Sequence, residues 1–317
     1  MPRIVVFAPS PVLTVTVEDH PDGPDVHLHA GGQGIWQARM LRTLGVDVTV
    51  TAALTGETGK VVRSILQDEG IRLEAVVRGG RGGAYVHDRR GGERDAIVET
   101  GGEPLTRHDL DELYGITLRE ALAADLVVLS GPASKNALPH DVYRRLAADL
   151  GTAGIRVVVD LAGDRLDEAV AGGVSVAKVS DEELHEQGRI KEYTVDQIVE
   201  AMHRLHEEGA ESVVITRAED PFLLLTDGKV HEITAPRMEV ADPKGAGDSL
   251  TAGMMSALAR GESVLDAVML GAAAGALNVT RHGLGTGDPE AIARLRELVT
   301  SRVLGDEESG NDQQEDS

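Results

Sequence analysis

Short apolar runs rich in valine, isoleucine and leucine recur along the chain, bounded by Gly, Asp or Pro. The strand-like runs span residues 3–7, 46–54, 125–131, 155–162 and 211–218. Between them lie stretches with helical spacing of apolar positions, at residues 34–45, 59–70, 141–154 and 194–209. The last of these opens on a Thr cap and closes on Gly209, as helices commonly do. Strands and helices in alternation predict a parallel sheet covered by helices on both faces.

Two segments follow a different period. Residues 12–30 and 81–101 alternate apolar and polar positions and contain Gly-rich turns. This pattern predicts short antiparallel strands with one exposed face, which would form a small sheet beside the main one. The polar, acidic residues 305–317 lack apolar anchors and are expected to be a disordered tail. We therefore expect one α/β unit over residues 1–304.

Composition narrows the class of protein. The chain has 317 residues, 41% of them hydrophobic, which is enough for a large core. Its 53 acidic and 31 basic residues give a net charge of -22, which argues against a general affinity for nucleic acid or anionic membranes. Solubility, or a salty cytoplasm, would account for this charge. The lack of cysteine, of a long apolar run and of a signal-peptide pattern leads us to expect a cytoplasmic protein.

The segment "DPKGAGDSLTAGMMSAL" carries the most specific chemistry. Gly245, Ala246 and Gly247 precede a predicted helix whose apolar positions include Leu250. Small residues at a helix N-terminus let backbone N–H groups converge on an anion, which the helix dipole also favours. Asp248 would then accept a proton from a hydroxyl that attacks the bound anion. The alternative is that Asp248 is a plain helix cap and that the glycines form a tight turn.

The longer segment from Asp242 to Gly283 resembles the C-terminal signature of the ribokinase-like, or PfkB, family of carbohydrate kinases. The similarity runs from about residue 3 to about residue 300. It includes "AGGQGIWQARM" and "VVLSGPASKNALPHDVYRRL", and is strongest with the 1-phosphofructokinase and tagatose-6-phosphate kinase branch. The resemblance implies an open, mostly parallel sheet with helices on both faces and a small β-sheet lid. It also implies transfer of a phosphoryl group from ATP, with Mg²⁺, to a hydroxyl of a sugar-like molecule.

The resemblance assigns roles to several residues. Asp248 would be the catalytic base, and the backbone of Gly245, Ala246 and Gly247 the anion hole. The metal would lie near Asp242 and Glu183. A second group of positions would contact the nucleotide: Ser180 in place of an Asn, Glu183, Thr216, Ala218 in place of a Gly, and Ala272 and Gly275 beside adenine. Lys244, where the family has Thr or a small residue, would add a cation for the ATP phosphates.

The acceptor side departs from the family pattern. The resemblance places Thr14, Gly31, Gly32, Gln33 and Trp36 in the acceptor site. Thr14 replaces an Asp, Gln33 a Lys and Trp36 an Asn, and in the lid Tyr85 and His87 stand where Arg and Asn are common. Lost cations weaken the hold on a substrate phosphate. We therefore expect phosphosugars to be poor acceptors and a neutral polyol, sugar or nucleoside to be preferred.

Several alternatives stay open. Trp36 would be either a core residue or a stacking wall, and the second option favours a nucleoside kinase. A catalytically weakened sugar-binding or regulatory protein is the other candidate. The lid arginines Arg89, Arg90 and Arg94 would either contact an anion or lie in solvated turns. The family also implies a possible homodimer through the lid.

Two further motifs are weak. "GETGK" at residues 56–60 lacks the earlier Gly and the following Ser or Thr of a P-loop. The histidine pairs at residues 27 and 29 and at 203 and 206 have a spacing that a metal would accept, but they are expected to face solvent.

Overall fold

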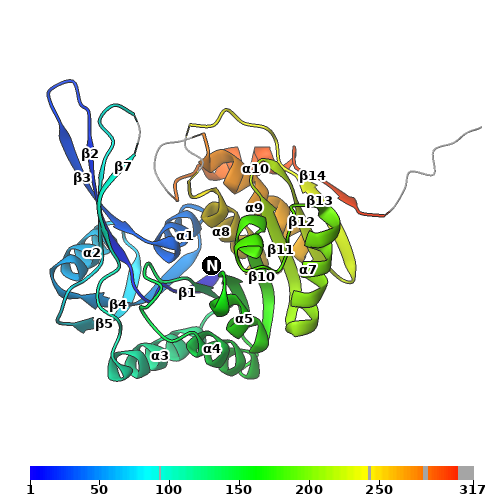
Figure 1. The fold of residues 1–317 in the computed structure, drawn as a ribbon, viewed down its shortest axis with the longest axis horizontal. Coiled ribbons are helices and arrows are strands. Elements are labelled where there is room, and N and C mark those ends of the chain that lie inside the picture. The colour runs from blue at the N-terminus through cyan, green and yellow to red at the C-terminus, as the bar shows by residue number, and fades with distance from the viewer. Residues whose placement is uncertain (93, 242–243, 281–284, 306–317) are drawn as a thin grey trace, which may run out of the picture.

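The computed structural model describes residues 1–92, 94–241, 244–280 and 285–305. In this part of the chain the strands form a large sheet and a small one (Figure 1). The large sheet has the strand order β14-β13-β12-β11-β10-β9-β8-β1-β4-β5. Its strands are β1 (Arg3–Phe7), β4 (Asp47–Thr55), β5 (Arg72–Arg78), β8 (Leu126–Ser130), β9 (Arg156–Asp160), β10 (Val174–Ser180), β11 (Ala210–Arg217), β12 (Asp220–Thr226), β13 (Lys229–Thr234) and β14 (Thr300–Val303).

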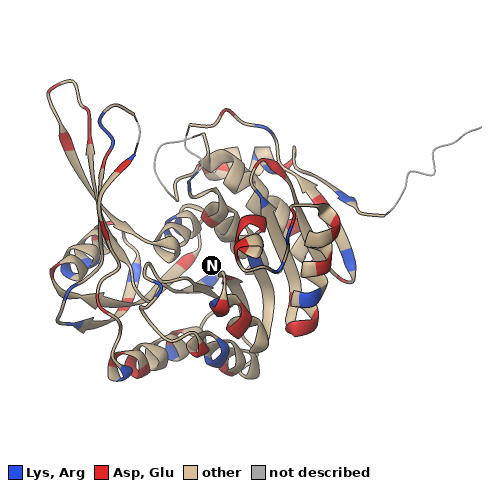
Figure 2. Ribbon diagram, viewed as in Figure 1, with Lys and Arg blue, Asp and Glu red and all other residues tan. Residues whose placement is uncertain are grey.

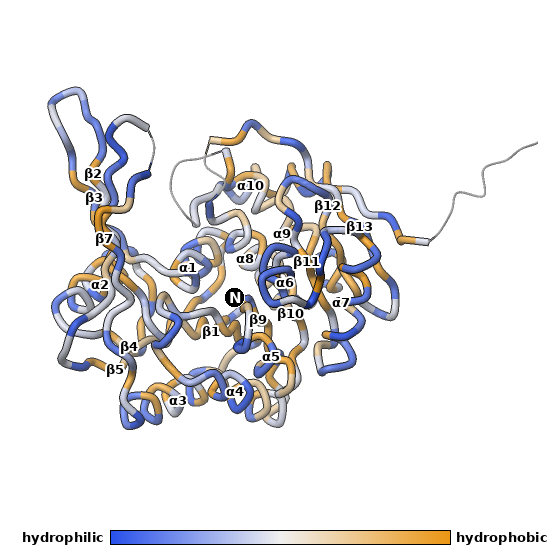
Figure 3. The backbone as a smooth tube through the Cα atoms, in the orientation of Figure 1, coloured by the Kyte–Doolittle hydropathy of each residue, from blue (hydrophilic) through white to orange (hydrophobic). Residues whose placement is uncertain are grey.

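The large sheet is parallel from β5 to β11 and antiparallel from β11 to β14. Every strand-like run expected from the sequence forms a strand of its parallel part. Strands β8 and β9 are almost entirely buried because helices cover both faces of the sheet. In Figure 3 the central strands are coloured as hydrophobic along much of their length. The antiparallel extension at β12 to β14 was not expected from the sequence.

Two layers of helices enclose the sheet, each with its own apolar core. One core contains side chains of α1 (Gln33–Thr43), α2 (Gly56–Asp68), α8 (Ala246–Leu258), α9 (Val264–Asn278) and α10 (Pro289–Arg296). The other contains side chains of α3 (Arg107–Ala121), α4 (Asp141–Thr152), α5 (Asp164–Ala171), α6 (Asp181–Glu186) and α7 (Val195–Glu208). The predicted helix caps are confirmed at α7, where the Thr194 side chain accepts from Gln197 N and Gly209 is the C-cap.

The small sheet forms a lid that projects from the body in Figure 1. Its strands, in the order β3-β2-β6-β7, are β2 (Val12–Glu18), β3 (Asp25–Gly31), β6 (Ala84–Asp88) and β7 (Asp95–Thr100). The hairpins β2–β3 and β6–β7 are antiparallel as expected, but β2 and β6 are parallel. The expected antiparallel strands are therefore confirmed, whereas the parallel pairing that joins the two hairpins was not predicted. The chain leaves the lid after β3, forms α1, β4, α2 and β5, and then returns to the lid as β6. Because β6 runs parallel to its neighbour β2, the two strands need a long crossover connection of this kind.

The two faces of the lid differ in polarity. Leu28, Val15, Val86 and Val98 are register partners across all four strands, and we call them the aliphatic row. Leu28 is 50% exposed and Val98 is 52% exposed. On the opposite face the equivalent partners are His29, Thr14, Tyr85 and Glu99. The polar face is turned toward the body, because the Tyr85 hydroxyl donates to Ala133 O, in the loop after β8, at 2.9 Å.

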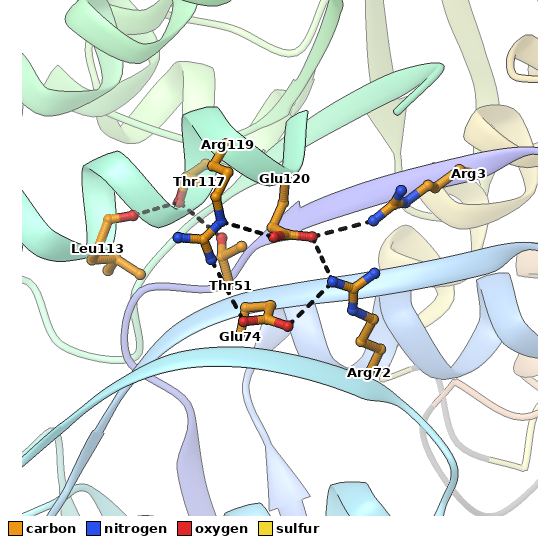
Figure 4. A network of polar contacts seen from close by, with 8 residues as sticks. All are labelled: Arg3, Thr51, Arg72, Glu74, Leu113, Thr117, Arg119 and Glu120. Carbon is orange, nitrogen blue, oxygen red and sulfur yellow. Dashed lines mark hydrogen bonds and ion pairs between the residues drawn. The ribbon is translucent and has the colours of Figure 1, made fainter. Parts of the chain in front are cut away.

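A buried acid ties the amino ends of β1 and β5 to α3 (Figure 4). The Glu120 carboxylate accepts hydrogen bonds from Arg3, Arg72 and Arg119 at 3.2, 2.9 and 3.2 Å. Since Arg3 begins β1 and Arg72 begins β5, this network marks the edge of the sheet opposite to the carboxyl ends of the strands.

Charged residues are spread over both layers of helices and the lid (Figure 2). Among the described residues, no helix is long and apolar enough to span a membrane. The predicted tail is beyond the described residues from position 306 onward.

Candidate active site

The carboxyl ends of β9 and β10 meet the start of α8 at one edge of the sheet. Asp160 is the last residue of β9 and Ser180 the last of β10, while Asp248 lies in the first turn of α8. Open α/β sheets bind ligands at this edge, because the strands end there and the helices that follow present their N-termini. The sequence therefore brings its principal candidate residue to the expected place.

The start of α8 has the geometry of an anion hole. Gly245 is the N-cap, in the left-handed conformation with φ 77°, and no side chain caps the helix. The first intrahelical bond runs from Ser249 N to Gly245 O, at 2.9 Å. The earlier N–H groups, including those of Ala246 and Gly247, therefore have no acceptor within the helix. The alternative in which Asp248 is a plain cap is wrong, because Gly245 occupies the cap position.

A buried ion pair lies at the bottom of the site, and the sequence interpretation missed it. Lys178 Nζ lies 3.0 Å from Asp160 Oδ1, and the two residues are 7% and 3% exposed. Lys178 Nζ also lies beside Gly247, where a methyl group on the glycine would be only 3.0 Å from it. An ammonium group is thus held next to the predicted anion hole. The signals in the sequence were a Lys inside the apolar run "VSVAKVS" and an Asp closing "RVVVD".

Asp160 also accepts hydrogen bonds from two neutral side chains. Gln37 Nε2 and Thr251 Oγ1 both donate to Asp160 Oδ2, at 3.0 and 2.8 Å. Gln37 is fully buried in α1, and its Oε1 accepts from Ser130 Oγ at 2.6 Å. These contacts link β8, β9, α1 and α8, so the position of Asp160 depends on four elements of the fold.

Asp248 is partly exposed, yet it stands among other charges. Burial is the largest influence and raises the pKa of Asp248 to about 8, and the nearby Asp160 carboxylate adds to this rise. Lys178 opposes the rise, Glu183 adds to it, and a hydrogen bond from Gln37 opposes it. Burial lowers the pKa of Lys178, but the surrounding carboxylates of Asp160, Asp248 and Glu183 outweigh it and raise that pKa overall. A carboxylate whose pKa approaches neutrality is suited to act as a general base.

The predicted nucleotide residues lie at the ends of β10 and β11. Ser180 and Thr216 are register partners in these parallel strands. Ser180 and Glu183 form a capping box at α6, in which Glu183 Oε2 accepts from Ser180 N at 2.8 Å. Ala218 has φ 44°, a conformation that favours glycine. This conformation is consistent with the Gly that the resemblance implies at that position.

The small residues of α9 serve close helix packing. A methyl group on Gly275 would lie 3.0 Å from Ala246 O, and one on Gly271 would overlap Leu250 O. Ala272 is 2% exposed. These contacts bring α9 against the start of α8. Room for adenine beside Ala272 and Gly275 stays a prediction.

The loop before α8 is anchored by α9. Asn278 Nδ2 donates to Lys244 O at 2.8 Å, and Asn278 Oδ1 accepts from Ser249 Oγ at 3.1 Å. Lys244 itself is exposed, beside the helix N-terminus. Asp242, the predicted metal ligand, lies outside the described residues.

The predicted acceptor residues gather where the lid joins α1. Gly32 is the N-cap of α1 with φ 108°, and Gln33 Oε1 accepts from Gly131 N at 2.8 Å. Gly31 ends β3, where any side chain would collide with the Thr14 hydroxyl. Thr14 Oγ1 is buried and has no hydrogen-bond partner among the described residues. Trp36 is partly exposed on α1, outside the buried core.

The lid arginines bind other lid residues. Arg90 Nη2 lies 2.6 Å from Asp88 Oδ2, and Arg89 Nη1 lies 3.8 Å from Glu18 Oε1. Arg94 Nε donates to His87 Nδ1 at 2.9 Å, while His87 Nε2 is 2.7 Å from Glu99. Of the two interpretations, these contacts favour a structural role in the lid over contact with a substrate anion.

Comparisons with known proteins identify the family of this chain. Residues 5–291 match the pfkB family of carbohydrate kinases. A 1-phosphofructokinase from Haloferax volcanii is 31% identical over 288 residues, covering 84% of this chain and 88% of that protein. A 1-phosphofructokinase from Bacillus subtilis is 28% identical over 259 residues, covering 81% of this chain and 84% of that protein.

Solved structures show the same fold. Phosphofructokinase-2 from Escherichia coli, in complex with potassium, has a TM-score of 0.82 and 23% identity, covering 94% of this chain and 99% of that one. Ribokinase from Arabidopsis thaliana, complexed with ribose and ATP, has a TM-score of 0.73 and 23% identity, covering 93% and 99%. With the family match over most of its length, this chain belongs to the pfkB family of carbohydrate kinases.

Proposed function

We propose that this kinase transfers the γ-phosphoryl group of ATP to a hydroxyl group of a sugar or sugar-like molecule, with Asp248 as the general base. The observation that carries this proposal is the joint position of Asp248, the start of α8 and Lys178 at the carboxyl edge of the sheet. A cation and orphan N–H groups beside a base are what phosphoryl transfer to an alcohol requires.

The acceptor oxygen forms a bond to the γ-phosphorus, and the bond from that phosphorus to the bridging oxygen of ADP breaks. The hydroxyl proton passes to Asp248. The N–H groups of Ala246 and Gly247 and the Lys178 ammonium lie where they would stabilise negative charge on the phosphate oxygens.

The described residues fit a Mg²⁺ ion that arrives with ATP. No group of three or more His, Asp or Glu side chains in the described residues is placed to hold a metal. Mg²⁺ in nucleotide sites usually takes one or two carboxylates, phosphate oxygens and water. Glu183, and Asp242 outside the described residues, are the acids we assign to it. Bound Mg²⁺ would neutralise phosphate charge, and Lys244 would add a cation at the same end of α8.

The contacts around the acceptor site favour a neutral acceptor. Gln33 and Tyr85, which replace family cations, are both bonded to backbone groups of the loop after β8. The lid arginines are bonded to lid residues. Each missing charged contact costs about 1.5 to 3 kcal/mol of binding, or roughly 10- to 100-fold in affinity. We therefore infer that a free sugar, polyol or nucleoside is preferred over a phosphosugar, although the curated relatives are named as phosphofructokinases.

An assay of ATP consumption with matched acceptors tests the proposal. The panel contains free sugars, polyols, nucleosides and the phosphosugars fructose 1-phosphate, fructose 6-phosphate and tagatose 6-phosphate. We expect turnover of a neutral acceptor and little of the phosphosugars. A preference for nucleosides would favour the partly exposed Trp36 as a stacking surface. ATP binding without turnover of any acceptor would favour the alternative of a weakened binding protein.

Efficient phosphosugar turnover, at kcat/KM of about 10⁴ M⁻¹s⁻¹ or above, would contradict the neutral-acceptor inference. Lys135 would then be the cation to test, since it is exposed and lies two residues after the lid contact at Ala133. Loss of that turnover in Lys135→Met would assign the phosphate contact to this residue.

We also infer a homodimer through the lid, with a second copy of this chain as the partner. The aliphatic row crosses all four lid strands and turns away from the body, and contiguous exposed apolar surface of this kind usually marks an interface.

An enzyme that consumes ATP and lacks cysteine would suit a cytoplasmic location.

A further inference from the structure

Asp160 is the most heavily bonded acid at the carboxyl edge of the sheet. It is 3% exposed and accepts from Lys178, Gln37 and Thr251 at 3.0, 3.0 and 2.8 Å. A buried carboxylate with three donors is stable only because each oxygen is satisfied. The Asp160 carboxylate lies at the end of β9 and not at the N-terminus of α8. We therefore expect it to act on the site through its hydrogen-bond partners.

Each hydrogen-bond partner of Asp160 also lies near the start of α8 or near Asp248. Lys178 Nζ lies beside Gly247. The Thr251 hydroxyl, one turn after Asp248, shares its single proton between Asp160 Oδ2 and Gly247 O, which lies 3.0 Å away. Gln37, whose Oε1 accepts from Ser130, presents its amide donors to Asp160 and toward Asp248. Asp160 thus holds the Lys178 ammonium and the Gln37 amide near Asp248, the proposed base.

We propose that Asp160 is a positioning residue of this active site, which anchors the Lys178 ammonium and the Gln37 amide beside Asp248. The proposal rests on the proposed function only in taking Asp248 as the base. Asp160 itself touches no reacting atom in this scheme. Its effect would appear in the proton affinity of Asp248 and in the placement of Lys178.

The charges that face Asp248 give the direction of this effect. Asp160 at the end of β9 and Glu183 in α6 raise its pKa, whereas Lys178 in β10 and Gln37 in α1 lower it. Removing the Asp160 charge removes one repulsion and so lowers the pKa of Asp248, whereas release of Lys178 and Gln37 from their anchor would raise it. The Asn oxygen can still accept from Lys178, so in Asp160→Asn we expect the loss of repulsion to dominate. Removing the Lys178 charge has the opposite effect, because two carboxylates then face each other and share a proton.

The test is the pH dependence of kcat/KM in two variants. In Asp160→Asn the acidic limb of the profile should move to lower pH by about one unit or more, which is about tenfold in proton affinity. In Lys178→Met the limb should move to higher pH. Because the two shifts have opposite signs, general loss of stability does not produce both. If Asp160→Asn does not fold, the Lys178→Met shift still tests the charge arrangement.

Glu120→Gln is the matched control. Glu120 is also a buried acid with three cationic or polar donors, but it lies at the opposite edge of the sheet (Figure 4). Its substitution should lower the melting temperature without moving the acidic limb. An equal shift of the limb in Glu120→Gln and Asp160→Asn would overturn the proposal.

A measurement without turnover separates this proposal from the proposed function. Aspartate carboxyl carbons labelled with ¹³C are titrated by NMR in the ligand-free protein, and the Asp248 signal is assigned by its loss in Asp248→Asn. We expect Asp248 to titrate at lower pH in Asp160→Asn than in the wild type. An unchanged Asp248 titration would refute the positioning role. Failure to consume ATP with any acceptor would refute the proposed function and leave this result standing.

Discussion

The hydroxyl group of Tyr85 in β6 donates a hydrogen bond of 2.9 Å to the carbonyl of Ala133, in the loop that follows β8. This contact connects the lid directly to the carboxyl edge of the main sheet. The neighbouring Gly131 N donates to Gln33 in α1, so the loop is bonded to the lid on one side and to α1 on the other.

Removing the Tyr85 hydroxyl should loosen lid closure. One hydrogen bond contributes about 0.5–1.5 kcal/mol, so Tyr85→Phe should raise the KM for the acceptor up to about tenfold, with little change in the KM for ATP. Steady-state kinetics with the acceptor found in the panel measure both values. Tyr114→Phe, which removes a 2.7 Å bond to Asp149 between α3 and α4, is the control and should change neither. Equal effects of the two substitutions would show that lid closure does not depend on Tyr85.

Asp248→Asn should abolish most turnover and keep the fold. The substitution removes the proton acceptor but not the helix cap, because Gly245 occupies the cap position. Turnover should fall by about 10²-fold or more, while calorimetry should still detect ATP binding. Near-normal turnover would exclude Asp248 as the base.

The raised pKa of Asp248 also predicts how stability depends on pH. The folded protein holds this proton up to about pH 8, whereas the unfolded chain releases it near the ordinary value of 3.8. The unfolded chain therefore binds fewer protons between these two values, and the contribution of Asp248 to stability falls as pH rises through this window. Asp248→Asn removes the effect. The melting temperature of the variant relative to the wild type should rise from pH 4 to pH 8, and a constant difference would contradict the assignment.

Ala218→Gly should stabilise the protein. Ala218 has φ 44° in the turn between β11 and β12, and a non-glycine residue there costs about 1–2 kcal/mol. The added chain entropy of Gly offsets about 0.4–1 kcal/mol, so the free energy of unfolding should rise by up to about 1.6 kcal/mol. Asp227→Gly, at φ 50° in the next turn, should gain less because Asp tolerates this conformation better. Denaturant unfolding of both variants measures the difference.

A charge in the aliphatic row should disrupt the lid dimer. Leu28→Lys places a cation at the β3 end of the aliphatic row, so light scattering after size-exclusion chromatography should show monomers. Leu122→Lys, at an exposed apolar position beyond the end of α3, is the control and should leave the assembly unchanged. A wild-type protein that is monomeric at all concentrations would exclude the dimer.

The sequence was sufficient for five strands of the parallel sheet and for α1, α2, α4 and α7, but not for β12 to β14 or for every contact between elements. The strand-like runs and the cap of α7 were predicted because periodicity and capping are local properties. The parallel pairing of β2 with β6 was not, since pairing depends on where the chain re-enters the lid. Asp248 was found because its neighbours are contiguous in sequence. Asp160 and Lys178 were missed because β9 and β10 bring them together only in the folded sheet.

The glycine contacts between α8 and α9 mean that the position of the proposed anion hole depends on the spacing of two backbones. Gly253 and Gly271 face each other so closely that a methyl group on Gly253 would lie 2.9 Å from the Gly271 Cα, and Gly275 meets Ala246 O. No side chain there can yield to absorb an added atom. A single methyl group on α9 would therefore displace the first turn of α8, and in the proposed mechanism it would misalign the bound phosphate without removing any contact to it. The backbone of α9 thus fixes the position of the helix that carries Asp248.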